Sequence, residues 1–254
     1  MGMAAWGTQD DDLQSIMYND FFGFDEDLKI RKNLHKGCMD YEPSIYPDNG
    51  TEQWKFDIAA NVQTICEWQI QKVFKKAKEL VPETDNMCYS GGVALNCVAN
   101  SLVVEKQYPN MWILPNPGDA GSSLGCAAYV NGKHLDFMEN GAFLGYNIKG
   151  DYPVKQVVKE LLKGNLVGVA NGRAEYGPRA LGNRSLLADP RGKDIKAQMN
   201  KIKNRQEFRP FAPSVLEEHA HEIFDMPTKK SQFMQYTAPC KFPDKYPAIC
   251  HVDN

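Results

Sequence analysis

Arginine residues are concentrated in one part of this sequence. Six of the seven arginines lie between residues 171 and 210, whereas the lysines are spread along the whole chain. These forty residues carry ten Lys/Arg and four Asp/Glu, a charge of +6, so the rest of the chain, whose total is −3, carries −9. Arginine offers five donors in a planar fork that fits phosphate and carboxylate groups, which the lysine ammonium cannot reproduce. The concentration therefore predicts a site for a polyanionic small molecule.

Two stretches of this region hold most of the cations. Residues 172–185 set three arginines and a glutamate among glycines and a proline, which expose backbone donors and fix the course of a loop. Residues 203–213 add cations beside aromatic residues and prolines that would hold them rigid. Nucleic acid is the competing partner. The acidic balance elsewhere and the lack of repeated aromatic and basic interleaving argue against it.

Two further loops, each after a predicted strand, have residues suited to a ligand. Ser90-Gly91-Gly92 would let the main chain approach a phosphate, although a tight turn without a ligand is the alternative. Asp119 lies in a Gly-Asp-Ala-Gly loop, where its carboxylate would bind a metal or instead cap the following helix. The sequence has no G-x-x-x-x-G-K-[ST], so any ATP site is not a P-loop. The five histidines lack the spacing of metal pairs.

The elements that must position these loops alternate between helices and strands. Apolar residues at three- and four-residue spacing predict a long helix over residues 54–80. Downstream, the alternation predicts an α/β architecture, and the small residues of 122–130 predict a closely packed helix. The predicted strands cover 86–89, 111–114 and 166–170, an alternating stretch covers 185–188, and the other predicted helices cover 93–106, 153–163 and 194–203.

Composition restricts the class of protein. With 254 residues and 43% hydrophobic residues, the chain is expected to fold into one or two domains. No apolar run reaches the roughly 18–20 residues of a spanning helix, and the N-terminus lacks a signal pattern, so no membrane partner and a cytoplasmic location are expected. Seven scattered cysteines without a C-x-x-C pair are expected to be reduced packing residues.

Five blocks, in family order, resemble the O-carbamoyltransferase family that includes the nodulation, cephamycin and tobramycin carbamoyltransferases. The most specific is GRAEYGPRALGNRSLLADPR over residues 172–191; the others cover residues 1–7, 90–96, 116–125 and 202–216. The resemblance implies that residues 1–140 are the C-terminal part of an actin/Hsp70-like ATPase-fold domain, similar to the threonylcarbamoyl transferases. It implies that residues 141–254 are a domain similar to threonylcarbamoyl-AMP synthase, truncated at its C-terminus.

The resemblance also implies a two-step activity. One domain would form carbamoyl-adenylate from carbamoyl phosphate and ATP, and the other would transfer the carbamoyl group to a hydroxyl of a small-molecule acceptor that the sequence does not name. The cofactors would be ATP and Mg²⁺, with Fe²⁺ as the alternative metal. The candidate catalytic residues are Arg173, Glu175, Arg179 and Arg184. The candidate ligand-binding residues are Ser90, Gly91, Gly92, Asn96, Arg191, Lys203, Arg205 and Arg209, and the candidate metal ligand is Asp119.

Members of the family have a long N-terminal stretch that this chain lacks, with acceptor-side catalytic residues and an H-x-x-x-H pair that binds iron. A separate chain supplying the N-terminal half is therefore an expected partner. A second hypothesis is a non-catalytic anion- or nucleotide-binding module that works only in complex. A third hypothesis, a sugar-kinase-like enzyme, explains the loops at Ser90 and Asp119 but gives the arginine-rich residues 172–191 no role.

Overall fold

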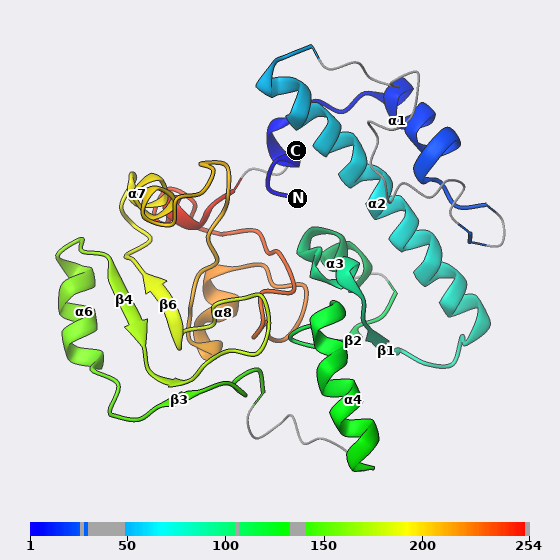
Figure 1. The fold of residues 1–254 in the computed structure, drawn as a ribbon. Coiled ribbons are helices and arrows are strands. Elements are labelled where there is room, and N and C mark those ends of the chain that lie inside the picture. The colour runs from blue at the N-terminus through cyan, green and yellow to red at the C-terminus, as the bar shows by residue number, and fades with distance from the viewer. Residues whose placement is uncertain (26–27, 30–48, 105–106, 133–140, 252–254) are drawn as a thin grey trace. The chain divides into compact units, whose positions relative to one another are not determined.

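The computed structural model describes residues 1–25, 28–29, 49–104, 107–132 and 141–251 (Figure 1), and the chain divides into two compact units. The first unit is formed mainly by Met1–Asp85, and the second runs over Asn86–Val104 and Tyr108–Cys250. The described residues form helices and three two-stranded sheets, which confirms the predicted mixed α/β class. The predicted domain boundary after residue 140 adjoins residues 133–140, which lie outside the described residues, and it stays a prediction.

The first unit is built along the long helix α2 (Glu52–Leu80), which confirms the helix predicted over residues 54–80. Thr51 caps its start, where the side chain accepts a hydrogen bond from the Trp54 N–H. Packed along it are the short helices η1 (Ala4–Trp6) and α1 (Asp11–Met17), and a π-helical turn, η2 (Tyr18–Phe22), continues α1 (Figure 1). Leu13, Met17 and Ile65 form the apolar contact between α1 and α2.

A buried amide fixes the N-terminal segment on α2. The Asn61 side chain is fully buried, and its Oδ1 accepts from the Asp10 N–H (2.9 Å) and the Gln14 side-chain amide (3.0 Å). Its Nδ2 donates to the Thr8 carbonyl (3.1 Å) and to the Asp57 carbonyl (2.8 Å). Both ends of the amide are thus satisfied, as burial of a polar group requires.

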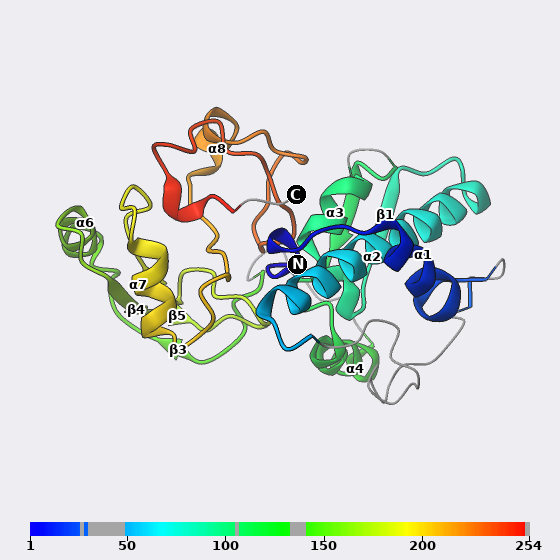
Figure 2. The same cartoon turned by 90° about the horizontal axis from the view of Figure 1, so that it is seen from above.

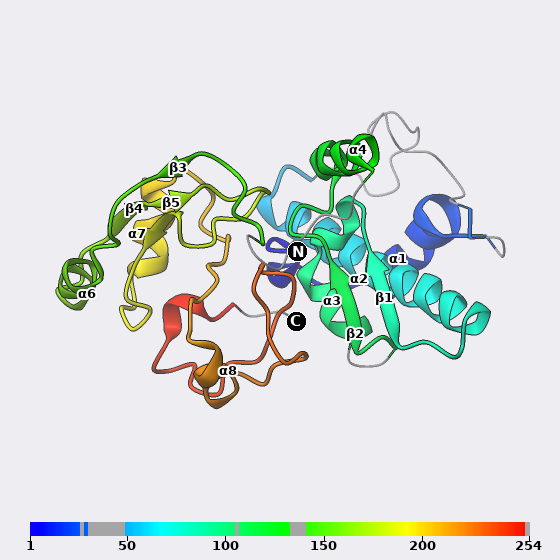
Figure 3. The same ribbon diagram turned by 90° about the horizontal axis from the view of Figure 1, so that it is seen from below.

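The second unit begins with two parallel strands, β1 (Asn86–Tyr89) and β2 (Asn110–Ile113), which lie side by side in Figure 3. They confirm two predicted strands, and their carboxyl ends meet at one edge. A 3-10 turn, η4 (Gly92–Leu95), and helix α3 (Cys97–Val104) follow β1. A second turn, η5 (Asp119–Gly121), and helix α4 (Ser122–Asn131) follow β2.

Two predictions in this half were wrong in detail. The helix predicted over residues 93–106 is divided, because Asn96 leaves the helical conformation and its Oδ1 accepts from the Ala99 N–H (3.2 Å) at the start of α3. The helix predicted over 122–130 exists as α4 but is not closely packed. None of its residues is buried, and Tyr129 and Val130 are 89% and 86% exposed.

The rest of the second unit contains two antiparallel strand pairs. Strand β3 (Asn147–Ile148) pairs with β5 (Gly172–Arg173), and β4 (Val167–Ala170) pairs with β6 (Arg184–Leu187). The helices are α6 (Val154–Leu162), α7 (Ile195–Ile202), α8 (Glu217–Ile223) and the 3-10 turn η6 (Pro247–Ile249). Figure 2 shows η6, in red, beside α7, where Ile195, Met199 and Ala248 form a small core.

Across the described residues, none of the helices is long and apolar enough to cross a membrane. The six cysteines that the structure describes are free thiols.

We predict that Asn61→Leu lowers the free energy of unfolding of the first unit by about 3 kcal/mol. The variant leaves the Asp10 N–H and the Gln14 amide without their acceptor inside the protein. Urea unfolding, with hydrogen exchange of the α2 amides to assign the change to this unit, measures the effect. Lys55→Ala, on the exposed side of the same helix, should change it by less than about 0.5 kcal/mol. Equal midpoints for Asn61→Leu and the unmodified chain would contradict the role given to Asn61.

Candidate anion site

The loops that follow β1 and β2 are hydrogen-bonded to each other. Pro117 O accepts from the Gly91 N–H (2.8 Å) and from the Ser90 hydroxyl (3.1 Å). Gly91 has a φ of +109°, a conformation that residues with a side chain rarely adopt. A Cβ placed on Gly91 or Gly92 meets no atom within 4 Å, so the outer side of the turn is open to a ligand. In parallel sheets, ligands bind at the carboxyl ends of the strands.

Residues 172–185, called here the arginine loop, contact both of these loops. The Tyr176 hydroxyl donates to the Ala120 carbonyl (3.2 Å) and lies 3.3 Å from the Ser123 hydroxyl. Arg179 donates to the Leu95 carbonyl in η4 (3.3 Å). At Gly177, where φ is +134°, a Cβ would lie only 3.0 Å from the Pro115 carbonyl oxygen. The structure therefore brings three separately predicted segments together.

The carboxylate of Glu175 closes the arginine loop on itself. Its Oε1 accepts from three backbone N–H groups, those of Leu181 (2.8 Å), Asn183 (2.9 Å) and Arg184 (3.2 Å). Partial burial raises the pKa of this carboxyl, but the backbone N–H donors together outweigh it, so the pKa lies below its ordinary value. Glu175 therefore holds the loop as an anion, and its predicted catalytic role stays a prediction.

Arg184 also acts on the backbone. Its guanidinium donates to the carbonyls of Asn183 (2.7 Å), Asn171 (3.0 Å) and Tyr146 (3.0 Å). These bonds join the two ends of the arginine loop to the segment that contains β3. Because carbonyls are neutral, the positive charge of Arg184 stays available to a nearby anion, although most of its donors are already used.

Arg173 and Arg179 are the arginines of the loop with the most free donors. Arg173 is exposed, and the one hydrogen bond of its guanidinium to the described residues is a long one to the Gly145 carbonyl (3.5 Å). Arg179 is half-buried, and its Nε is buried without a hydrogen-bond partner among the described residues. No carboxylate in the described part of the chain forms an ion pair with either one. An unpaired, partly desolvated guanidinium favours binding of an anion.

The cations after α7 form a second group, the α7 cluster, which consists of Lys203, Arg205 and Arg209. Arg205 donates to the buried Asn200 Oδ1 (2.6 Å) and lies 4.3 Å from the centre of the Phe211 ring. Burial, and then the charge of Arg209, lower the pKa of Arg205. Lys203 and Arg209 are exposed. None of the three donates a hydrogen bond to the arginine loop. The cations predicted to bind anions therefore form two separate groups.

Arg191 differs from the other predicted arginines because it is already paired. Its Nε donates to Asp189 Oδ1 (2.8 Å), and its terminal nitrogen donates to Asp189 Oδ2. The Arg191 guanidinium holds the pKa of Asp189 below its ordinary value. Arg191 is thus neutralised within the chain.

Asp119 is exposed at the first position of η5, and its carboxylate accepts no hydrogen bond from the described residues. The alternative prediction, that Asp119 caps the helix, is therefore not observed. The described residues contain no group of three or more His, Cys, Asp or Glu side chains that could hold a metal ion. One carboxylate is too few ligands for Mg²⁺ or Fe²⁺, so these residues alone do not fit a metal.

Sequence reasoning missed two residues that organise the site. Asn200 is fully buried, and its Nδ2 donates to the Glu207 carbonyl (3.1 Å) and the Arg209 carbonyl (3.2 Å) that shape the α7 cluster. Tyr176 joins the arginine loop to the β2 loop. The position of Tyr176 within the arginine-rich residues 172–191 could have drawn attention to it. A single polar residue in a helix, such as Asn200, gives no comparable signal.

Two family models match the chain. The description of the first is carbamoyltransferase N-terminus, which covers residues 4–128, and that of the second is carbamoyltransferase C-terminus, which covers residues 158–254. This chain belongs to the carbamoyltransferase family. The β1 and β2 loops lie in the N-terminus match and the arginine loop lies in the C-terminus match, so both parts of the family contribute to the site.

Curated relatives match the carbamoyltransferase chain over part of their length. An uncharacterized protein of Synechocystis sp. is 37% identical over 216 residues, which are 72% of this chain and 35% of that protein. Nodulation protein NolNO of Sinorhizobium fredii is 31% identical over 233 residues, which are 80% of this chain and 34% of that protein. Nodulation protein U of the same species is 34% identical over 188 residues, which are 68% of this chain and 34% of that protein. The chain spans about a third of the length of these relatives.

We predict that Glu175→Ala opens the arginine loop. The amides of Leu181, Asn183 and Arg184 lose their shared acceptor, and their hydrogen exchange should accelerate by about tenfold or more. Glu175→Gln is the matched control, because its side-chain oxygen still accepts from the same amides, and it should show the smaller effect. The measurement that tests this prediction is the hydrogen-exchange rate of these three amides, determined by NMR. Unchanged exchange in Glu175→Ala would contradict the closing role.

The Glu175 carboxylate also predicts a pH dependence. Its folded pKa is lowered, so the stability it gives the loop is fully present above the unfolded value of about 4.3 and is lost as the pH falls through the lower folded value. The amide proton shifts of Leu181 and Asn183 should therefore move as the pH falls below the ordinary pKa of a glutamate. Glu175→Gln should remove this movement; a variant that titrates like the unmodified chain would exclude Glu175 as its source.

Proposed function

We propose that this chain carries the anion-binding, activating part of a carbamoyltransferase. The reaction is the formation of carbamoyl-adenylate from carbamoyl phosphate and ATP, followed by transfer of the carbamoyl group to an acceptor hydroxyl. In balanced form, water cleaves carbamoyl phosphate to carbamate and phosphate. A carbamate oxygen then displaces pyrophosphate from the α-phosphorus of ATP.

The observation that supports this proposal is the pair Arg173 and Arg179. Both are without carboxylate partners among the described residues, on a loop that Glu175 holds closed and that contacts the β1 and β2 loops. A closed loop with free guanidinium groups is preorganised for anions, and binding needs little rearrangement.

The chemical task of these residues is to bring two anions together. Carbamoyl phosphate and ATP repel each other, and guanidinium groups offset that repulsion and orient the reacting atoms. Arg179 would use its buried Nε, and Arg173 would use its exposed donors. The β1 turn at Ser90-Gly91-Gly92 would bind the nucleotide through its open backbone. ATP supplies the activating group, and the chain's own part is to bind and orient the two anions.

The finer fold assignment belongs to the same proposal. The residues that match the N-terminus model would be part of an actin/Hsp70-like domain, and those that match the C-terminus model part of a threonylcarbamoyl-AMP-synthase-like domain. Two parallel strands with ligand loops at their carboxyl ends support the first assignment.

A second candidate is an anion-binding module that needs a partner chain for turnover. Asp119 favours it, because this exposed carboxylate has no co-ligands among the described residues. A separate chain with the N-terminal half of the family would supply them, together with the acceptor site.

We predict that pyrophosphate release from ATP depends on carbamoyl phosphate and falls by about 100-fold or more in Arg179→Ala. Truncation removes the guanidinium that donates to the Leu95 carbonyl in η4 and has a buried Nε without a partner among the described residues. The measurement is a coupled pyrophosphate assay with and without carbamoyl phosphate, and Lys229→Ala, far from this loop in sequence and exposed, is the control.

Calorimetry with carbamoyl phosphate separates the two candidates. Binding that is lost in Arg179→Ala, without pyrophosphate release in the unmodified chain, would favour the module. A folded chain that neither binds carbamoyl phosphate nor releases pyrophosphate would refute both.

A further inference from the structure

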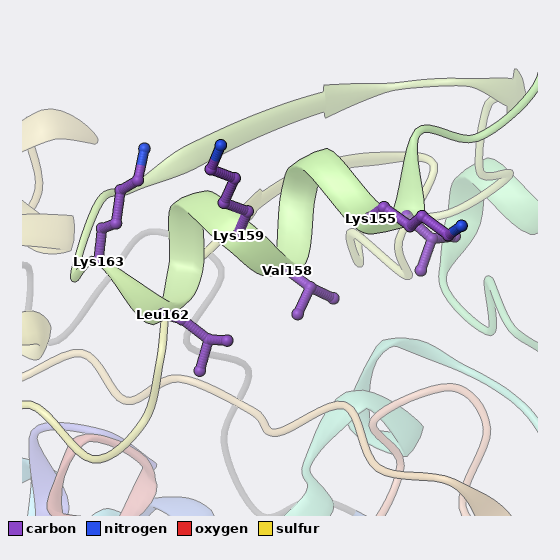
Figure 4. A pocket seen from close by; sticks show the side chains of 6 residues that line it. Lys155, Val158, Lys159, Leu162 and Lys163 are labelled. Carbon is purple, nitrogen blue, oxygen red and sulfur yellow. The ribbon is translucent and has the colours of Figure 1, made fainter.

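Helix α6 has a row of exposed aliphatic side chains along one side. Val154, Val158 and Leu162 follow one another at four-residue spacing, and they are 58%, 46% and 66% exposed. In Figure 4, Val158 and Leu162 point to the same side of the helix. Val157, only 8% exposed, already packs α6 onto its own unit. The apolar surface of α6 is therefore wider than the part that the described chain covers.

A row of lysines runs beside the aliphatic row. Lys155, Lys159 and Lys163 occupy the next position in each turn, and the two rows together line a shallow depression of about 470 Å³ (Figure 4). Lys163 is paired with Glu160 (2.7 Å). Lys155 and Lys159 form no ion pair with the residues that the structure describes. The depression thus combines an apolar floor with cations on one flank.

We propose that this face of α6 is a docking site for an acidic amphipathic helix of a partner protein. Such a helix would place an aliphatic row on Val154, Val158 and Leu162 and a row of Asp or Glu against the lysines. Helices recognise grooves by apolar anchors at three- and four-residue spacing, and complementary charges fix the register and exclude wrong partners.

Charge distribution argues against a second copy of this chain as the occupant. Antiparallel pairing of two α6 helices about a two-fold axis sets the lysine row of one against the lysine row of the other, and opposed like charges are unfavourable. A membrane surface is also a poorer match. Helix α6 has nine residues and no aromatic residue, whereas helices that lie on membranes bury larger apolar faces.

The experiment uses a designed helical peptide of about 20 residues with a leucine row flanked by glutamates. It should bind the full chain with a dissociation constant of the order of 10–100 µM. Lys155→Glu/Lys159→Glu should weaken binding by about tenfold or more, and a peptide with lysines in place of the glutamates should then bind the variant and not the unmodified chain. Lys229→Glu/Lys230→Glu makes the same change in net charge away from α6 and should leave binding unchanged.

NMR chemical shifts of the α6 amides should report the contact. Equal binding of the glutamate and lysine peptides would overturn the proposal, because the lysine row would then have no part. Absence of binding, or binding that survives Lys155→Glu/Lys159→Glu, would overturn it as well. Stronger association with phosphatidylserine vesicles than with the peptide would assign the face to a membrane. Self-association abolished by Val158→Asp would assign it to a second copy.

Discussion

The three hydrogen bonds from backbone N–H groups to the Glu175 carboxylate are the interaction on which the candidate site depends. The arginine loop, which has three glycines and one proline, gains no order from helix or sheet hydrogen bonding between residues 174 and 183. One carboxylate oxygen of Glu175, which accepts from the N–H groups of Leu181, Asn183 and Arg184, fixes the course of the loop. This loop carries Arg173 and Arg179, and Tyr176, which lies between them in the sequence, donates to the β2 loop. Order within the loop and contact with its neighbours thus have one origin.

The charges of the second unit divide into paired and unpaired cations, and this division matters more than the total charge. Arg191 is neutralised by Asp189, and most donors of Arg184 are already used by carbonyls. Arg173 and Arg179 have neither kind of full partner in the described residues. A guanidinium whose Nε is buried and unbonded costs free energy until an anion satisfies it. An anion bound at the arginine loop would supply the acceptor that Arg179 Nε lacks among the described residues.

The sequence predicted the regular elements well wherever periodicity alone decides. The helix over residues 54–80 has a clear apolar period, and the strands at 86–89 and 166–170 are short apolar runs between turn residues. The prediction of one helix over residues 93–106 was wrong because Asn96 ends the turn η4 and its side chain caps the start of α3. The prediction that α4 is closely packed was wrong because small residues allow another element to come close but do not ensure that one lies there.

For the candidate site, the concentration of arginine predicted the region of the chain but not which residues hold the loop and which have free donors. The spacing of residues in the sequence does not show that the Glu175 carboxylate accepts from backbone N–H groups. Nor does it show that Arg184 donates to backbone carbonyls beside β3 and β5. The buried Asn61 and Asn200 were invisible for the same reason, since the partners of an amide come from distant or non-regular segments.

The most direct measurement is a crystal structure of the chain with carbamoyl phosphate and a non-hydrolysable ATP analogue. The expected result is phosphate oxygens within hydrogen-bond distance of Arg179 Nε and of the Arg173 guanidinium, with the Glu175 bonds intact. Anions bound only at the α7 cluster, above an empty arginine loop, would contradict the central claim that this loop is the preorganised anion site.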